Sequence, residues 1–276
     1  MQTINETRPA YFVCCFQRKG DFWAEITQKD HSLIKFPRHG KMKCATCFGN
    51  RNTRKIKNWK IRNDPGHWGS RNPKYLILGF SKGATQQDIY DSGNFDDIAF
   101  GGKQCRSNLS KILQSVGLLS KNETVDQKIK KTEKDFAFAS LVRCSVSRKF
   151  NGKYITSGSL ITRSFKEIPE IISTCINKYL TKTPNRLSII IMLGISDKYI
   201  EECRKAIKNI NRNRFNEIND VAYIQNNKLF VHIAHPSPGN GHIKDWISGK
   251  STVGKKKRLA EDAIKFGFRR SVSLEN

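Results

Sequence analysis

Two loops of this sequence carry residues suited to chemistry on a ligand. The stretch His235-Pro-Ser-Pro-Gly-Asn240 follows an apolar segment at 229–234, and Gly79-Phe-Ser-Lys-Gly-Ala84 follows another at 75–78. An imidazole can stabilise an anion, and glycine-rich backbone can approach a flat ligand closely. Because ligands of open α/β sheets bind outside the carboxyl ends of strands, we expect both loops to face one cleft.

The charge of the chain indicates the class of partner. Its 276 residues include 50 Lys and Arg against 24 Asp and Glu, which gives a formal net charge of +26. Such an excess favours a polyanionic partner, because each neutralised phosphate releases counterions. A lysine-rich composition is the alternative explanation, but the excess is too large for that alone. Together with the two loops, the charge favours chemistry on a base of a nucleic acid.

The sequence also bounds the compartment. It has neither a signal peptide nor an apolar run long enough to cross a bilayer, so we expect a cytoplasmic protein that does not associate with a membrane. We also expect a monomer. In a reducing compartment the eight cysteines do not form a disulfide framework, and metal or cluster ligation becomes the competing explanation.

Four of the cysteines have positions that suit a shared centre. Cys44-Ala-Thr-Cys47 is a pair whose sulfurs can bind one centre, Cys144 ends a predicted strand, and Cys175 lies in the next predicted helix. The four converge if the early loop folds over the connection between that strand and helix. Four thiolates suit Zn and an iron–sulfur cluster equally well. The alternative is accidental spacing, with Cys175 in the core.

The elements that position these residues alternate between apolar strands and amphipathic helices. This alternation predicts an α/β fold, a three-layer α/β/α sandwich around a central, mainly parallel sheet. Strands are predicted at 75–78, 136–142, 187–193 and 229–234, and helices at 103–117, 164–180, 196–209 and 253–267.

Two parts of the chain are predicted to flank or interrupt this pattern. Residues 1–40 form a hairpin-like extension, with strands at 10–15 and 23–26. Residues 41–276 form the α/β domain. Within it, 41–73 is a long basic loop held by something other than core packing.

The ordered set of segments from 44 to about 268 resembles the uracil-DNA glycosylase superfamily, in its iron–sulfur branches. The segments that carry the resemblance are Cys44-x-x-Cys47, Tyr75-Leu-Ile-Leu-Gly79-Phe80, Phe100-Gly-Gly, Gly117-Leu118, Leu141-Val-Arg-Cys144, Glu170 to Cys175, Ile189 to Gly194 and His235-Pro-Ser-x-x-Asn240. The resemblance implies DNA as partner. It also implies a structural 4Fe–4S cluster on Cys44, Cys47, Cys144 and Cys175, with Zn as the alternative metal.

The departures from that family concern the base. Phe80 follows the glycine of the first motif, which is nearest the broad-specificity branch, but Lys103 stands where that branch carries Asp. Ser140 stands where uracil-specific members place an Asn that reads the base edge. Residues 147–162 form an insertion rich in Gly, Ser, Lys and Tyr. These changes favour a pyrimidine larger than uracil or differently decorated.

The resemblance implies a monofunctional DNA glycosylase, which flips a base out of the stack, cleaves its glycosidic bond and leaves an abasic site. In that reaction His235 would stabilise the anionic base. Asp88 is the first choice for the carboxylate that activates water, with Asp91, Asp96 and Asp97 as alternatives. The predicted base-binding residues are Gly79, Phe80, Phe100 and Ser140, with Phe100 as the first choice for stacking. The predicted DNA-binding residues are Lys82, Arg143, Ser237 and Asn240.

Several functions stay open on the sequence. Some members of the superfamily serve in defence against phages whose DNA carries glucosylated hydroxymethylcytosine, and the departures are compatible with that role. An ordinary repair glycosylase for uracil or other deaminated bases is the first alternative. A non-catalytic DNA-binding homologue is the second, and a zinc-binding structural protein is the third.

Overall fold

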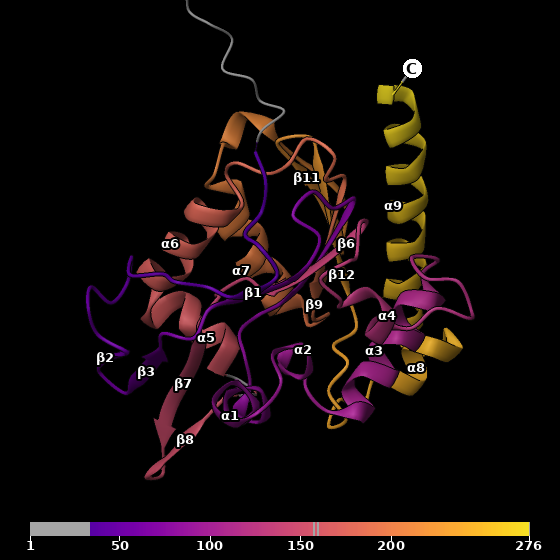
Figure 1. The fold of residues 1–276 in the computed structure, drawn as a ribbon. Helices are drawn as coiled ribbons and strands as arrows, with labels where there is room; N and C mark the ends of the chain where they lie inside the picture. Colours follow the sequence, from indigo (N-terminus) through magenta and orange to yellow (C-terminus); the bar gives the residue numbers. More distant parts are fainter. Residues whose placement is uncertain (1–33, 157, 159, 276) are drawn as a thin grey trace, which may run out of the picture. The chain divides into compact units, whose positions relative to one another are not determined.

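The computed structural model describes residues 34–156, 158 and 160–275. Its centre is an eight-stranded sheet (Figure 1). The strands, in spatial order, are β1 (Gly40–Lys41), β4 (Gly66–Gly69), β6 (Phe136–Ser140), β5 (Tyr75–Gly79), β9 (Ile189–Leu193), β12 (Lys228–Ile233), β11 (Ala222–Gln225) and β10 (Phe215–Asn219). The four inner strands, from β6 to β12, run parallel, whereas the pairs at both edges are antiparallel. The predicted α/β class is therefore confirmed, with a sheet that is parallel at its centre.

Helices cover both faces of this sheet, because the side chains of each inner strand alternate between two cores. On β5, for example, Ile77 belongs to one core and Leu76 and Leu78 to the other. The first core is covered by α3 (Lys103–Ser115), α4 (Val125–Lys128), α8 (Ile243–Ser248) and α9 (Ser251–Glu275). The second is covered by α5 (Leu160–Glu167), α6 (Pro169–Tyr179) and α7 (Asp197–Lys208). The three predicted layers are thus present (Figure 1).

The prediction of a long loop over 41–73 is wrong. This segment contains β1 and β4, and also β2 (Thr53–Ile56) and β3 (Trp59–Arg62). The last two join β7 (Ser145–Phe150) and β8 (Lys153–Ile155) in a second sheet, in the order β2-β3-β7-β8. Trp59 and Ile61 alternate with polar residues and are almost fully buried. Core packing therefore holds the segment.

The predicted helix over 164–180 is two helices, because a proline interrupts it. Pro169 is the first residue of α6, and Ile168 before it is not helical, with φ −140° and ψ 49°. A proline ring disfavours helical backbone in the preceding residue, so the chain bends there. The apolar residues Ile171, Ile172, Cys175 and Ile176 of α6 are nevertheless buried.

The other predicted elements are found within a few residues, except that α9 continues to Glu275. Two short helices that were not predicted, α1 (Ala84–Ser92) and α2 (Phe95–Ile98), connect β5 to α3. The strands predicted at 10–15 and 23–26 lie outside the described residues. None of the described helices is both long and apolar enough to cross a membrane.

Two buried histidines should make the fold sensitive to acid. Burial lowers the pKa of His67 and of His232 from 6.5 to about 3. Below pH 6.5 the unfolded chain binds these protons and the folded chain does not, so stability is complete above that pH and falls below it. We expect the free energy of unfolding to fall by about 1 kcal/mol for each histidine between pH 6.5 and 5.5.

Urea denaturation at a series of pH values measures this loss. The His232→Gln variant should lose about half of the pH dependence, because one of the two groups no longer titrates. An unchanged pH dependence in this variant would show that other groups control acid unfolding.

Candidate active site

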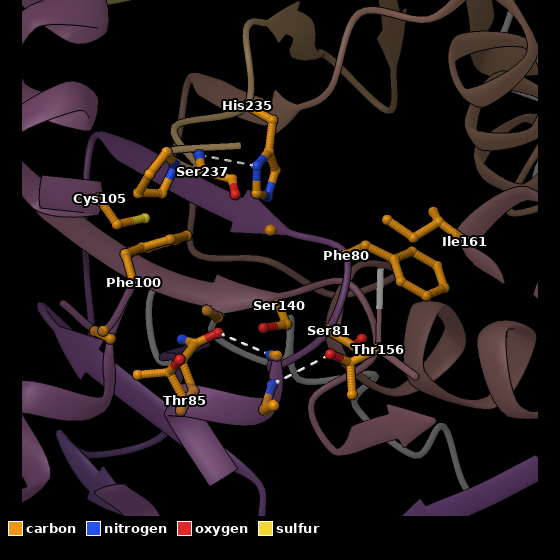
Figure 2. Close-up of a pocket in the computed structure, with 18 of the residues that line it drawn as sticks. Phe80, Ser81, Thr85, Phe100, Cys105, Ser140, Thr156, Ile161, His235 and Ser237 are labelled. Atoms are coloured by element: carbon orange, nitrogen blue, oxygen red, sulfur yellow. Dashed lines mark hydrogen bonds between the residues drawn. The ribbon is translucent and has the colours of Figure 1, made fainter. Parts of the chain in front are cut away.

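The carboxyl ends of three inner strands open onto one cavity of about 330 Å³ (Figure 2). Its walls include Gly79 and Phe80 at the end of β5, Ser140 at the end of β6, and His235 and Ser237 after β12. The expectation that the two loops face one cleft is therefore confirmed. The parallel strands bring together residues that lie more than 150 positions apart in sequence.

His235 enters the cavity with a defined tautomer. Its Nδ1 accepts a hydrogen bond from the backbone N–H of Ser237 at 3.2 Å, and burial lowers the pKa of the ring below its usual 6.5. The ring is therefore neutral at physiological pH. Because Nδ1 acts as acceptor, the proton of the neutral ring lies on Nε2, which becomes a hydrogen-bond donor. A neutral donor of this kind can stabilise a negative charge that develops in the cavity.

Asparagine side chains fix the loop that carries His235. Asn240 Nδ2 donates to the carbonyl of His235 at 2.7 Å, and Asn240 Oδ1 accepts from the N–H of His242 at 3.1 Å. From α3, Asn108 donates to the carbonyl of Pro236 at 3.1 Å. Asn240 was predicted to grip DNA, but its amide is used within the loop. These hydrogen bonds hold the backbone of His235 in place.

Phe100 borders the cavity with a strained backbone. Its φ is +50°, a left-handed conformation that costs a residue with a side chain about 1–2 kcal/mol. The flanking carbonyls hold it there, since Ile98 accepts from Gln86 at 2.8 Å and Ala99 from Arg106 at 3.0 Å. Strain of this kind concentrates at binding and catalytic sites.

The backbone of Gly79 lies beside the ring of Phe100. A Cβ at Gly79 would lie 3.4 Å from Cε1 of Phe100, an ordinary van der Waals contact. Phe80 also borders the cavity, but its ring packs on Phe165 and Tyr199 at centroid distances of 5.7 and 6.4 Å. Figure 2 shows this ring turned towards Ile161, away from Phe100. Of the two phenylalanines, Phe100 therefore stays the candidate for stacking on a ligand; Trp68 also lines the cavity, with its ring stacked on Phe95 at a centroid distance of 4.8 Å.

None of the predicted carboxylates lines the cavity. Asp88 and Asp97 are exposed, Asp91 pairs with Arg62, and Asp96 with His39 at 2.7 Å. The reason is that the chain after the β5 loop forms α1 and α2, whose acidic residues face solvent or pair on the surface. Within the described part of the chain, the polar side-chain groups on the cavity wall are hydroxyls, one amide, one thiol, the imidazole of His235 and the indole N–H of Trp68. The hydroxyls belong to Ser81, Thr85, Ser140, Thr156 and Ser237.

Lys82 and Arg143 are not on a DNA-binding surface, which corrects that prediction. Their exposed fractions are 1% and 2%. The ammonium group of Lys82 lies 3.5 Å from the buried carboxylate of Asp64 and donates to the carbonyl of Arg143. Asp64 also accepts from the N–H of Ser145 at 2.7 Å. This buried cluster ties the β5 loop to the segment after β6, and sequence reasoning missed Asp64 altogether.

Three of the four predicted ligand cysteines lie in or against the second core, and Cys44 lies near Cys175. Cys144 and Cys175 are buried there, and Cys47 packs against the same core. Burial raises the pKa of Cys175 to about 11, and Cys47 and Cys44 nearby add to the rise. Burial alone would raise the pKa of Cys44, but hydrogen bonds from Thr46 and Tyr179 and the charge of Lys178 lower it. The pKa of the Cys44 thiol is therefore lowered, whereas burial raises the pKa of the Cys47 and Cys175 thiols.

The surroundings of these cysteines suit an anionic group. The guanidinium of Arg143 is buried beside them, 4.8 Å from the centroid of the Tyr179 ring, and its three nitrogens have no hydrogen-bond partner among the described residues. A buried cation without partners is costly. In the same part of the structure no three possible ligands are close enough to hold a single metal ion.

Among known proteins, the chain is similar to solved structures. No family model and no curated protein matches the chain. The structure resembles that of SMUG2 from Pedobacter heparinus with a TM-score of 0.37 and 14% sequence identity, over 75% of this chain and 78% of that chain. We therefore base the proposed function on the geometry of the cavity.

Proposed function

We propose that the protein is a monofunctional DNA glycosylase that binds a flipped, modified pyrimidine in the cavity and hydrolyses its glycosidic bond. The observation that carries the proposal is the neutral His235, whose Nε2–H is available to an anion in the cavity that Phe100 borders. A base in a duplex must leave the stack to reach such a pocket. The net charge of +26 supports DNA as the partner.

The chemistry follows from these groups. Cleavage of the glycosidic bond leaves its electron pair on the base and an oxocarbenium-like sugar. His235 donates its hydrogen bond to the anionic oxygen of the departing base, while Phe100 stacks on its face. Water then adds to the sugar carbon, and its proton neutralises the base. The products are a free base and an abasic sugar, and no strand is cut.

The cavity supports a substituted pyrimidine as the substrate. Its volume of about 330 Å³ lies in the range of sites for drug-sized ligands, which are larger than one pyrimidine ring. Ser81, Thr85 and Thr156 add hydroxyl groups to its wall, which suit a polar substituent such as a sugar. Ser140 offers a single hydroxyl where an amide would read uracil. We infer a hypermodified base, with glucosylated hydroxymethylcytosine of phage DNA as the leading candidate and anti-phage defence as the role.

A 4Fe–4S cluster on Cys44, Cys47, Cys144 and Cys175 is part of the proposal. The gathering of the four thiols and the unpartnered guanidinium of Arg143 support it. When bound, such a cluster would supply a structural link and no redox step. Its protein ligands would join the segment before β2 to the β6–β7 connection and to α6.

Mass spectrometry of released bases tests the activity. The protein is incubated with plain DNA and with DNA that carries uracil, hydroxymethylcytosine or glucosylated hydroxymethylcytosine. We expect release from the glucosylated DNA alone, with abasic sites left in the strand. Release of uracil would indicate a repair glycosylase. Tight DNA binding without release of any base would indicate a non-catalytic homologue.

A further inference from the structure

The small sheet β2-β3-β7-β8 presents a basic outer face. On its inner side Trp59 and Ile61 are buried, so Lys60 between them, and the residues in register with Lys60 on the neighbouring strands, lie on the other face. Lys55 pairs with Lys60 across β2 and β3, and Lys149 pairs with Tyr154 across β7 and β8. The Lys60 ammonium lies 5.5 Å from the centroid of the Tyr154 ring. We call Lys55, Lys60, Lys149 and Tyr154 the basic face.

The charges of the basic face have no internal counter-charge. Lys55 and Lys60 stand directly opposite each other, and like charges in that position destabilise a sheet. In the described part of the chain no carboxylate forms an ion pair with Lys55, Lys60 or Lys149. A polyanion on this face would remove the repulsion, because its phosphates would lie between the ammonium groups.

The basic face is attached to the wall of the cavity. Directly after β8, the hydroxyl of Thr156 accepts a hydrogen bond from the N–H of Ala84 at 3.2 Å, and both residues line the cavity. Ile161, at the start of α5, lines it as well. In Figure 1, β7 and β8 extend beside α1, at the same end of the molecule as the cavity loops. A strand that placed a base in the cavity would therefore have this face beside it.

We propose that the phosphate backbone of the DNA strand that delivers the base lies on the basic face. This inference rests on the proposed function only for the identity of the polyanion. Lys55, Lys60 and Lys149 contact phosphates, and the ring of Tyr154 holds the Lys60 ammonium in place through a cation–π contact. In this proposal the insertion at residues 147–162, which contains Lys149 and Tyr154, takes part in DNA binding.

The salt dependence of DNA binding tests this proposal. Fluorescence anisotropy of a labelled duplex without modified bases gives the affinity of the wild type and of Lys55→Gln/Lys60→Gln/Lys149→Gln at several salt concentrations. If each lysine contacts one phosphate, the slope of log K against log[salt] becomes shallower by about 2.7 in the triple variant. Affinity at low salt should fall by more than about tenfold.

The matched control removes the same number of charges at the other end of the parallel strands, away from the cavity. Lys134, Lys182 and Lys265 are exposed near the amino ends of the parallel strands, and their replacement by Gln should change the slope much less. The basic-face variant should also melt no lower than the wild type, because it relieves the repulsion between Lys55 and Lys60. Equal loss of slope in both triple variants would overturn the proposal.

The two proposals can fail separately in this design. If the wild type releases no base but its DNA binding still depends on the basic face, this inference stands and the proposed activity fails. If the wild type releases its base and the basic-face variant binds DNA as tightly as the control variant, the activity stands and this inference fails.

Discussion

Replacement of His235 by Ala is expected to slow base release by about 100- to 1,000-fold, which is the usual cost of removing one donor to a developing oxyanion. The cause is loss of the Nε2–H in the cavity. DNA binding should remain, because the basic face and the rest of the surface charge are unchanged. Single-turnover release with enzyme in excess measures the chemical step directly. The matched control is His242→Ala, in the same loop, where the side chain is exposed and the backbone N–H bonded to Asn240 is retained.

The pH dependence of release distinguishes a neutral from a charged imidazole. Burial lowers the pKa of His235 below its usual 6.5. The ring is therefore mostly neutral at pH 6.5 and gains a proton only at lower pH. We expect the rate to stay level down to about pH 6.5 and to fall below it, as Nδ1 stops accepting from Ser237. The His235→Ala variant should lack this acid limb. A rate that rises on acidification would mean that the imidazolium is the active form.

The sequence predicted the inner strands and the cavity because both depend on local patterns. Continuous apolar runs mark β5, β6, β9 and β12, and the chain leaves a parallel strand at the same edge each time. The rule placed the loops at Gly79 and His235 together without any contact information, whereas Ser140 was predicted from the family resemblance. The sequence also contains a turn signal for the second sheet, which the prediction did not use. Asn151-Gly152 has positive φ at both positions, 45° and 78°, as the tight turn between β7 and β8 requires.

The failures at Lys82 and Arg143 had another cause. Both follow strand ends, where polar residues usually face a ligand or solvent. Buried Lys82 pairs with Asp64, which belongs to a segment that was predicted to be a loop. No local sequence pattern predicts a pair so far apart in the chain. Arg143 is buried against Tyr179 on α6 for a similar reason. Burial of a charge depends on its tertiary partners, so a sequence pattern of one element cannot predict it.

Serine substitution of Cys144 or Cys175 is expected to remove the iron and to destabilise the protein. Protein purified without oxygen should be brown, with iron–thiolate absorbance at about 400 nm, and each variant should lose both colour and iron. The melting temperature should fall as well, because the buried guanidinium of Arg143 would lose its anionic neighbour, and an unpaired buried charge costs more than about 1–3 kcal/mol.

A matched cysteine separates the cluster from ordinary packing. Cys203 on α7 is fully buried in the same core but lies outside the predicted ligand set, so Cys203→Ala should keep the iron even if it melts lower. Elemental analysis and the visible spectrum are read together with the melting temperature. Iron retained in both serine variants would reject the cluster assignment. A colourless protein that contains zinc would instead place a zinc ion at the four cysteines, and the guanidinium of Arg143 would then need another anionic partner.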